Sequence, residues 1–426
     1  MIMNLINRTD IKLSPQLVRR TEAAQPMATV HRRLSRKPRI AFYSHDTMGM
    51  GHLRRNMLIA SALSSGRCQA DTLLIAGTRE AGFFAEQAGL DCVTLPALTK
   101  NRDGKYSARH YSWSLEETTR LRGRVIASTL LAFRPDILVV DKLPQGICNE
   151  LQRTLKLVRS RIQTHCILGL RDVLDEPEVA IREWASSNND EIIEKYFDEV
   201  WVYGDPSVYD CRAEYQFAES TLERICFTGY LDQKARSSFA ELEPKSQQPL
   251  ALCVVGGGQD GVGLAQAFVE GGVPKGWRGE VITGPFMPVS DKQQLIQTAL
   301  KHCPAGSEPI KIIDQLVEAD DYVSQADRVV AMGGYNSVMA VLSFRKPALI
   351  VPRTRPRAEQ WIRAKRLSTA GLITTLHPND LSPRAIHDWL VQPDVAAPRQ
   401  HNIDLAGLDH IQSRVMACLA NRQCVV

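Results

Sequence analysis

Apolar residues occur along this chain in short runs, and longer amphipathic segments separate most of the runs. The runs have the length of buried strands, whereas segments such as residues 116–133 and 149–159 have the length of helices. Strands that alternate with helices predict an α/β fold in which helices cover both faces of a parallel sheet. The predicted strands are residues 39–44, 72–76, 92–95, 137–140, 166–170, 200–203, 225–228, 250–255, 281–283, 311–313, 328–331, 348–351 and 372–375.

The alternation lapses in one polar stretch, where we place a linker at residues 233–249. This divides the chain into an N-terminal α/β domain at 38–232 and a C-terminal one at 250–398. Residues 1–37 are polar and basic and are expected to be a disordered extension; a tether to anionic lipid or to a partner is the alternative. Residues 399–426 contain a final amphipathic helix, which we expect to pack back on the first domain.

Composition narrows the class of protein. The chain has 426 residues, of which 44% are hydrophobic and 23% charged, as in soluble globular proteins. The net charge of +5 is modest for this length, and much of it lies in the basic extension, so a nucleic-acid partner is not expected. The ten cysteines show no metal-ligand spacing. Because no apolar run suits a signal peptide or a membrane span, we predict a cytoplasmic protein.

A first glycine-rich turn follows the strand 39–44 and reads HDTMGMGH. Its glycines let a phosphate or a sugar approach the backbone at the start of the next helix. His52 closes the motif. Its ordinary pKa of ~6.5 suits a general base that takes a proton from a hydroxyl group. The alternative is a histidine at a helix end that hydrogen-bonds only to backbone.

A second glycine-rich turn, GGGQDGVG, follows the strand 250–255. Gly256, Gly258 and Gly261 satisfy the dinucleotide pattern GxGxxG, but the next strand ends VITGPFMP, without the acidic residue that would hold a ribose. Three interpretations remain open: a nicotinamide or flavin site, a loop that faces another phosphate or sugar, and a tight turn.

A third turn contains Gly333 and Gly334 and leads into a helix that Asn336 or Ser337 is expected to cap. A strand and a basic loop follow, and the loop carries Arg353, Arg355 and Arg357. A helix N-terminus supplies only about +0.5 charge, so a departing diphosphate needs further cations where no metal is bound. The arginines would supply them; the alternative is a solvated loop face. The chain has no Asp-x-Asp, which argues mildly against a metal.

Arg171 and Asp172 directly follow the predicted strand 166–170, on the side where parallel sheets bind ligands. The carboxylate would orient an acceptor hydroxyl or assist His52. An ion pair that stabilises its own loop is the alternative. Residues 100–113 form a long polar stretch with aromatics, which we predict to be a functional loop.

Four segments in this order resemble a known family. GMGHLRR, GLRDVLD, VWVYGDP and MGGYNSV are similar to segments of bacterial proteins called predicted glycosyltransferases, and the second half resembles the peptidoglycan N-acetylglucosaminyltransferase group. The resemblance covers residues 39–381. It implies the GT-B architecture, in which two Rossmann-like domains face a central cleft.

The resemblance also implies roles for residues. His52 matches a proposed base, Glu359 and Gln360 match a motif that contacts the hydroxyls of the donor sugar, and Ala340 replaces a glutamate that holds the ribose. The expected donor side comprises Gly256, Gly257, Gly258, Gly333, Gly334, Asn336, Ser337, Arg353, Arg355, Glu359 and Gln360. The expected acceptor side comprises Gly49, Gly51, Arg54 and Arg171, with His52 and Asp172 as catalytic residues.

These features predict an inverting, metal-independent transfer of a sugar from a nucleotide-diphosphate sugar to a hydroxyl group. No cofactor is expected, and a UDP-sugar is the default donor. The acceptor is a saccharide or a lipid-linked molecule, and the basic extension permits peripheral membrane association. Two alternatives stay open: a nucleotide-sugar epimerase on the same fold, and a non-catalytic protein that binds nucleotide sugars, for which Ala340 is the sequence evidence.

Overall fold

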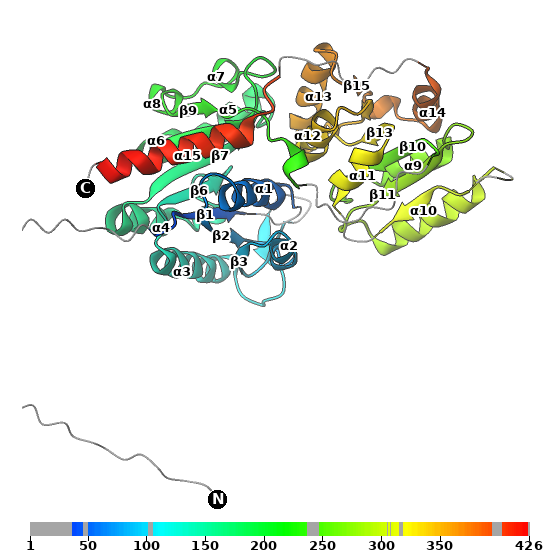
Figure 1. Cartoon of the computed structure of the whole chain (residues 1–426). Coiled ribbons are helices and arrows are strands. Elements are labelled where there is room, and N and C mark those ends of the chain that lie inside the picture. The colour runs from blue at the N-terminus through cyan, green and yellow to red at the C-terminus, as the bar shows by residue number, and fades with distance from the viewer. Residues whose placement is uncertain are drawn as a thin grey trace, which may run out of the picture. The chain divides into compact units, whose positions relative to one another are not determined.

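Figure 1 shows the computed structural model of the chain. The structure describes residues 36–45, 50–100, 105–236, 247–304, 306, 308–314, 318–393 and 403–424. The elements below all lie in one compact unit, Lys37–Val426. The predictions for residues 1–35, for Gly49 and for most of the linker fall outside the described ranges, and the domain boundaries stay predictions.

The first sheet has seven parallel strands in the order β3-β2-β1-β6-β7-β8-β9. Its strands are β1 (Arg39–Ser44), β2 (Asp71–Ala76), β3 (Asp91–Thr94), β6 (Ile137–Asp141), β7 (His165–Arg171), β8 (Glu199–Tyr203) and β9 (Ile225–Phe227). The helices of this half are α1 (Gly51–Ser65), α2 (Ala81–Gln87), α3 (Leu115–Phe133), α4 (Gln152–Leu157), α5 (Pro177–Ser186), α6 (Asn189–Tyr196), α7 (Cys211–Glu214) and α8 (Glu219–Leu222).

The second sheet has six parallel strands in the order β12-β11-β10-β13-β14-β15. They are β10 (Leu250–Val254), β11 (Arg278–Ile282), β12 (Lys311–Ile313), β13 (Arg328–Ala331), β14 (Ala348–Ile350) and β15 (Thr374–Thr375). The helices are α9 (Val262–Gly271), α10 (Val289–Lys301), α11 (Ala319–Gln325), α12 (Tyr335–Ser343), α13 (Glu359–Thr369) and α14 (Pro383–Val391), and α15 (Gly407–Cys424) follows.

Helices cover both faces of each sheet, which explains why the strands are apolar along their whole length. Alternate residues of β1 enter different cores: Ile40 and Phe42 face α1, α2 and α15, whereas Ala41 and Tyr43 face α3 and α4. The core beside α1 continues into the second domain through α11 and α12. The predicted fold class, two Rossmann-like α/β domains, is confirmed.

Each sheet has one point where the strand order reverses. In the first sheet β1 lies between β2 and β6, and in the second β10 lies between β11 and β13. Loops that leave neighbouring strands in opposite directions open a crevice at such a point, and open α/β sheets bind ligands there. The three glycine turns found in the sequence follow β1, β10 and β13.

The last helix, α15, packs on the first domain, as expected. Arg67, which follows α1, donates from its backbone N–H to the Gln412 side chain over 2.9 Å. Leu231 and Ala406 form an isolated antiparallel bridge. Figure 1 shows α15, in red, lying along the first domain. In the described parts of the chain, no helix combines the length and the apolar character needed to cross a membrane.

Two local predictions are wrong. Within the stretch 100–113, which was predicted to be a loop, residues 106–108 form the strand β5 (Tyr106–Ala108), which pairs antiparallel with β4 (Leu98–Lys100); strands of three residues are too short to show periodicity. The residue at the N-cap of α12 is Gly334. Neither Asn336 nor Ser337 accepts a capping hydrogen bond with its side-chain oxygen, because both already lie inside the first turn of the helix.

Candidate functional site at the facing sheet edges

A histidine and a buried aspartate meet where the first sheet reverses its order. His52 lies in the first turn of α1, and its Nδ1 atom is 3.1 Å from Oδ2 of Asp141, the last residue of β6. Asp141 is fully buried, while the His52 side chain is 18% exposed. Arg55, also buried, donates from one guanidinium nitrogen to both Asp141 oxygens, at 2.5 and 2.6 Å. The parallel pairing of β1 with β6 brings these residues together.

The charges around Asp141 keep it ionised. Burial favours the protonated acid, but the charges of Arg55 and His52 outweigh burial and hold the pKa of Asp141 well below its ordinary value. An ionised Asp141 favours a proton on Nδ1 of His52, which leaves the lone pair of a base on Nε2, whereas a donating nitrogen of Arg55, 3.1 Å from the same Nδ1, favours the opposite tautomer. His45, whose ring centroid is 4.6 Å from that of His52, is buried; burial, then the charge of His52, lowers the pKa of His45.

Asp172 has a different partner from the one predicted. Arg363, on α13 in the second domain, donates to both Asp172 oxygens over 2.6 to 3.0 Å, and both side chains are fully buried. The Val173 backbone N–H and the Tyr230 hydroxyl also donate to Asp172. With four donors already bound, Asp172 stabilises the contact between domains. The carboxylate that contacts His52 is Asp141, which the sequence prediction missed.

The second domain contacts the start of α1 directly. Asn336, in the first turn of α12, donates from Nδ2 to the backbone oxygen of Gly51 over 3.1 Å. Gly51 is exposed and Gly334 is the N-terminal cap of α12. The N-terminal ends of α1 and α12 therefore lie in contact.

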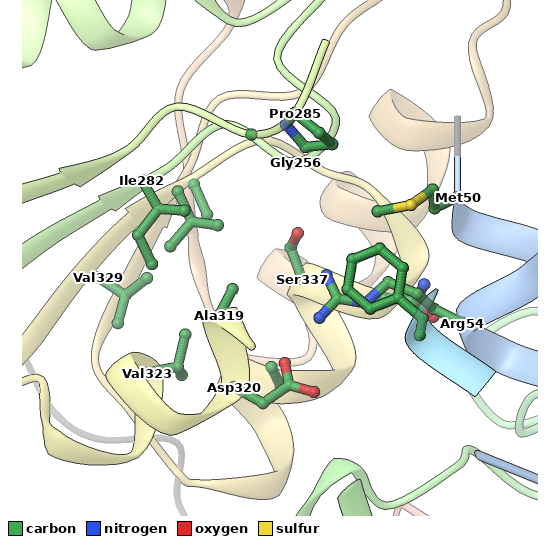
Figure 2. A pocket seen from close by; sticks show the side chains of 16 residues that line it. Met50, Arg54, Gly256, Ile282, Pro285, Ala319, Asp320, Val323, Val329 and Ser337 are labelled. Atoms are coloured by element: carbon green, nitrogen blue, oxygen red, sulfur yellow. The ribbon is translucent and has the colours of Figure 1, made fainter. Parts of the chain in front are cut away.

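A solvent-open cavity of about 40 Å3 lies between the start of α1, the turn after β10 and the helices α11 and α12. Figure 2 shows Met50 and Arg54 entering it from the α1 side, with Ile282, Val323 and Val329 on the opposite side. Gly256 and Ser337 also line it, as does Ala340, which is 1% exposed. The cavity thus contains predicted donor residues from two glycine turns and the position where the resemblance implies a glutamate.

The polar end of the cavity is built from charges of both domains. Arg54 forms an ion pair with Glu318, and each side chain is 19% exposed. Asp320, at the start of α11, is 4% exposed and accepts from Arg236 over 3.2 Å. Burial raises the pKa of Asp320 despite the opposing charges of Arg236 and Arg54. Arg54 was predicted on the acceptor side, whereas here it lines the cavity that contains the donor glycines.

The predicted glycines divide into open and packed positions. Gly256 has a φ of +63° and open space where a Cβ atom would be, so a ligand can approach its backbone. Gly333 is packed, because a Cβ atom there would lie 2.8 Å from Cβ of Pro352 and 3.1 Å from Cβ of Gln360. Gly333 therefore allows α13 to pack against the turn, whereas Gly256 and Gly334 border space that a substrate can occupy.

Two of the three loop arginines are already paired with carboxylates. Arg353 donates to Asp260 over 2.8 Å and to Glu359 over 3.0 Å. Arg357 donates to Asp175 and Glu183 of the first domain, over 2.9 and 2.8 Å.

Arg355 is exposed. Through these ion pairs, Arg353 and Arg357 stabilise their own loop and its contact with α5. If Arg353 or Arg357 is to bind a diphosphate, as predicted, its ion pairs with these carboxylates must first break.

Glu359 and Gln360 are buried at the start of α13. Gln360 accepts from the backbone N–H of Arg353 over 3.2 Å, and Glu359 forms a 3.7 Å ion pair with Arg171. Burial disfavours the Glu359 carboxylate, but the charges of Arg171 and Arg353 outweigh it and lower the pKa of Glu359. Arg171, predicted on the acceptor side, lies at the end of β7 beside this carboxylate.

Some site residues were detectable in the sequence and others were not. Asp141 ends the apolar run ILVVD, the same signal that drew attention to Arg171 and Asp172 after the next strand. Arg55 gave no signal, because a single arginine in an amphipathic helix is usually exposed. Among the described residues, no group of three or more His, Cys, Asp and Glu side chains is placed to hold a metal ion. Metal independence stays a prediction.

Comparison with known proteins supports this architecture. No protein-family model matches the chain. The sequence is 22% identical over 316 residues to an "Uncharacterized glycosyltransferase" of Methanosarcina mazei. The aligned region covers 71% of this chain and 77% of that protein.

Among solved structures, the calicheamicin glycosyltransferase CalG4 superposes with a TM-score of 0.57 at 16% identity, covering 90% of this chain and 99% of that one. A putative UDP-N-acetylglucosamine 2-epimerase from Listeria monocytogenes gives 0.55 at 15% identity, covering 91% and 97%. The chain has the two-Rossmann GT-B fold that these proteins share.

Proposed function

We propose that this protein transfers a sugar from a nucleotide-diphosphate sugar to a hydroxyl group of an acceptor. The observation that carries the proposal is the contact of His52 with buried, ionised Asp141, opposite the glycine turns of the second sheet. A polarised imidazole at the edge of one sheet can accept the proton of the acceptor hydroxyl, and open glycine turns at the edge of the other can bind the phosphates of the donor.

In the proposed reaction, Nε2 of His52 takes the proton of the acceptor hydroxyl. The acceptor oxygen forms a bond to the anomeric carbon of the sugar, and the bond from that carbon to the diphosphate oxygen breaks. The nucleoside diphosphate leaves with the electron pair. A single displacement of this kind inverts the anomeric configuration. Asp141 stabilises the imidazolium that forms, as the carboxylate of a catalytic triad does.

The donor nucleotide is assigned to the cavity between α1, α11 and α12. Its apolar side, with Val254, Ile282 and Val329, suits a nucleobase, and Gly256, which also lines the cavity, offers backbone approach to phosphate oxygens. Ala340 leaves α12 without a carboxylate for the ribose. Asp320 of α11 lines the same cavity and is the acidic group placed to accept from ribose hydroxyls. A UDP-sugar remains the default donor.

A thermal-shift screen against nucleotide sugars, followed by product analysis, tests this proposal. A donor present at ~100 times its dissociation constant adds roughly 2.7 kcal/mol of stability, so one compound should raise the melting temperature selectively. That donor should then release nucleoside diphosphate when saccharide or lipid-linked hydroxyl acceptors are added. A protein that binds every compound tested weakly, or none, contradicts the proposal.

The structural similarity to a putative epimerase leaves epimerisation of a nucleotide sugar as a second candidate function. Its fold matches this chain as well as that of CalG4 does, and the fold alone does not separate the two reactions. Incubation of the stabilising donor without acceptor distinguishes them. An epimerase changes the configuration of the sugar or releases it, whereas a transferase leaves most of the donor intact until an acceptor is present.

A further inference from the structure

Two cations at the carboxyl edge of the first sheet have side chains without a hydrogen-bond acceptor among the residues that the structure describes. The Arg171 side chain is 15% exposed, and within the described ranges its guanidinium donates no hydrogen bond; it has the 3.7 Å ion pair with Glu359. Glu359 is shared, because Arg353 donates to it over 3.0 Å. The side chain of Lys142, which is half-buried, has no hydrogen bond or ion pair with any described residue.

Neighbouring buried cations differ from these two. Arg363 donates three bonds to Asp172 and one to the oxygen of Gly333. Arg55 is bound to Asp141, and Arg122 to Glu150 and the backbone oxygen of Pro96. A buried charged donor without an acceptor lowers stability by several kcal/mol, which proteins avoid unless a ligand supplies the acceptor.

The backbone places the two cations side by side. Lys142 directly follows β6 and Arg171 ends β7, and these strands are neighbours, with the Lys142 N–H donating to Gly169 over 2.8 Å. Lys142 adopts a left-handed conformation with a φ of +64°. Such a conformation is unfavourable for a lysine and persists where the surrounding structure enforces it, most often at functional sites. Asp141, the partner of His52, is the preceding residue.

We propose that Lys142 and Arg171 together bind a phosphate group of a substrate on the first-domain side of the cleft. The inference rests on the proposed function and deepens it, because it assigns an anionic group to the substrates. A phosphate supplies several acceptor oxygens, and the planar guanidinium binds two of them at once while the ammonium binds a third. The phosphate belongs either to the donor diphosphate or to an acceptor that itself carries a phosphate.

The electrostatics of the pair agree with an anion site. Burial, then the charges of Arg171 and Arg357, lowers the pKa of Lys142 to about 7, although Glu359 and Asp141 act in the opposite direction. Burial also lowers the pKa of Arg171 to about 10, against the charge of Glu359. His45 is a further titratable neighbour of Lys142 among the described residues. The described surroundings therefore disfavour both positive charges, and an anion would stabilise them.

Binding of inorganic pyrophosphate to the full chain tests the inference. Arg171→Met and Lys142→Gln each remove one charge, and Arg384→Met, on a side chain that is 90% exposed, is the matched control. Loss of charged hydrogen bonds should weaken pyrophosphate binding about 10-fold or more in the first two variants. Without ligand, Lys142→Gln should not lower the melting temperature, because the Lys142 side chain makes no hydrogen bond or ion pair with a described residue.

The control and wild-type protein should bind pyrophosphate equally. The inference is wrong if both Arg171→Met and Lys142→Gln bind pyrophosphate within about two-fold of wild type. If Arg171→Met fails to fold, Lys142→Gln, whose side chain makes no bond to a described residue, decides the question alone.

A competition experiment identifies which substrate carries the phosphate. If a saturating nucleoside diphosphate excludes pyrophosphate, and the variants weaken nucleotide binding, the pair binds the donor diphosphate. If pyrophosphate still binds beside the nucleotide, the pair binds an acceptor phosphate. Failure of the proposed function is separate: pyrophosphate binding would depend on Lys142 and Arg171 while no nucleotide sugar is bound or turned over.

Discussion

The two ends of β7 differ in how their charged residues are paired. At the amino end, His165 is 3.1 Å from Glu199 and 3.6 Å from Asp198, and Arg414 of α15 donates to Glu199 over 2.7 Å. At the carboxyl end, Arg171 donates no hydrogen bond within the described part of the chain. One strand of seven residues therefore has a fully paired charge cluster at its amino end and, at its carboxyl end, an arginine without a hydrogen-bond acceptor among the described residues.

The pKa values express this difference. At the amino end burial favours a neutral imidazole, but contacts with Cys418 and Glu199 outweigh burial and raise the pKa of His165 to about 9. At the carboxyl end burial prevails and lowers the pKa of Arg171 to about 10. Charges whose partners lie in the chain stabilise the fold, whereas charges without partners at a cleft are available to a ligand.

The largest expected effect on stability comes from breaking a fully buried ion pair close to the carboxyl end of β7. Asp172→Asn removes the charge that faces Arg363 in a fully buried pair. Removing one partner of such a pair leaves a buried charge uncompensated and should lower the free energy of unfolding by about 3–5 kcal/mol. Urea denaturation measures the change, with Asp388→Asn, an exposed partner of Arg384, as the control. A loss below about 1 kcal/mol would contradict a structural role for Asp172.

A somewhat smaller, pH-dependent effect is expected at the amino end of β7. Because the folded pKa of His165 is about 9 and its unfolded value ~6.5, its stabilisation is fully present below pH 6.5 and disappears as the pH rises through 9. The stability difference between wild type and His165→Gln should shrink by roughly 3 kcal/mol across this range. Denaturation at pH 6 and pH 9.5 measures it. A difference independent of pH would show that His165 is not held in its charged form.

The smallest effect is expected at an exposed contact between domains. Arg366 donates to Glu214, and the two side chains are 50% and 32% exposed. Solvent screens such pairs, so Glu214→Gln should change the free energy of unfolding by less than about 1 kcal/mol. A loss similar to that of Asp172→Asn would mean that exposure does not distinguish the contacts between domains.

The sequence predicted local features well and long-range partners poorly. Apolar runs predicted the strands, and the glycine turns with His52 predicted the approximate position of the candidate site. Each of these signals is contained within a few consecutive residues. The partner of His52 was missed because Asp141 reaches it only through the pairing of β1 with β6. The partner of Asp172 was not predicted because Arg363 lies 191 residues later.

Turnover of the donor by His52→Ala tests the account most directly. The donor is the nucleotide sugar that stabilises the protein, and the rate is that of nucleoside diphosphate release with acceptor present. Loss of a general base should lower this rate about 10²–10⁴-fold, while the dissociation constant of the donor changes by less than about two-fold. His302→Ala, on an exposed histidine at the end of α10, is the control and should keep the wild-type rate. An unchanged rate for His52→Ala would contradict the assignment of the His52–Asp141 pair to catalysis.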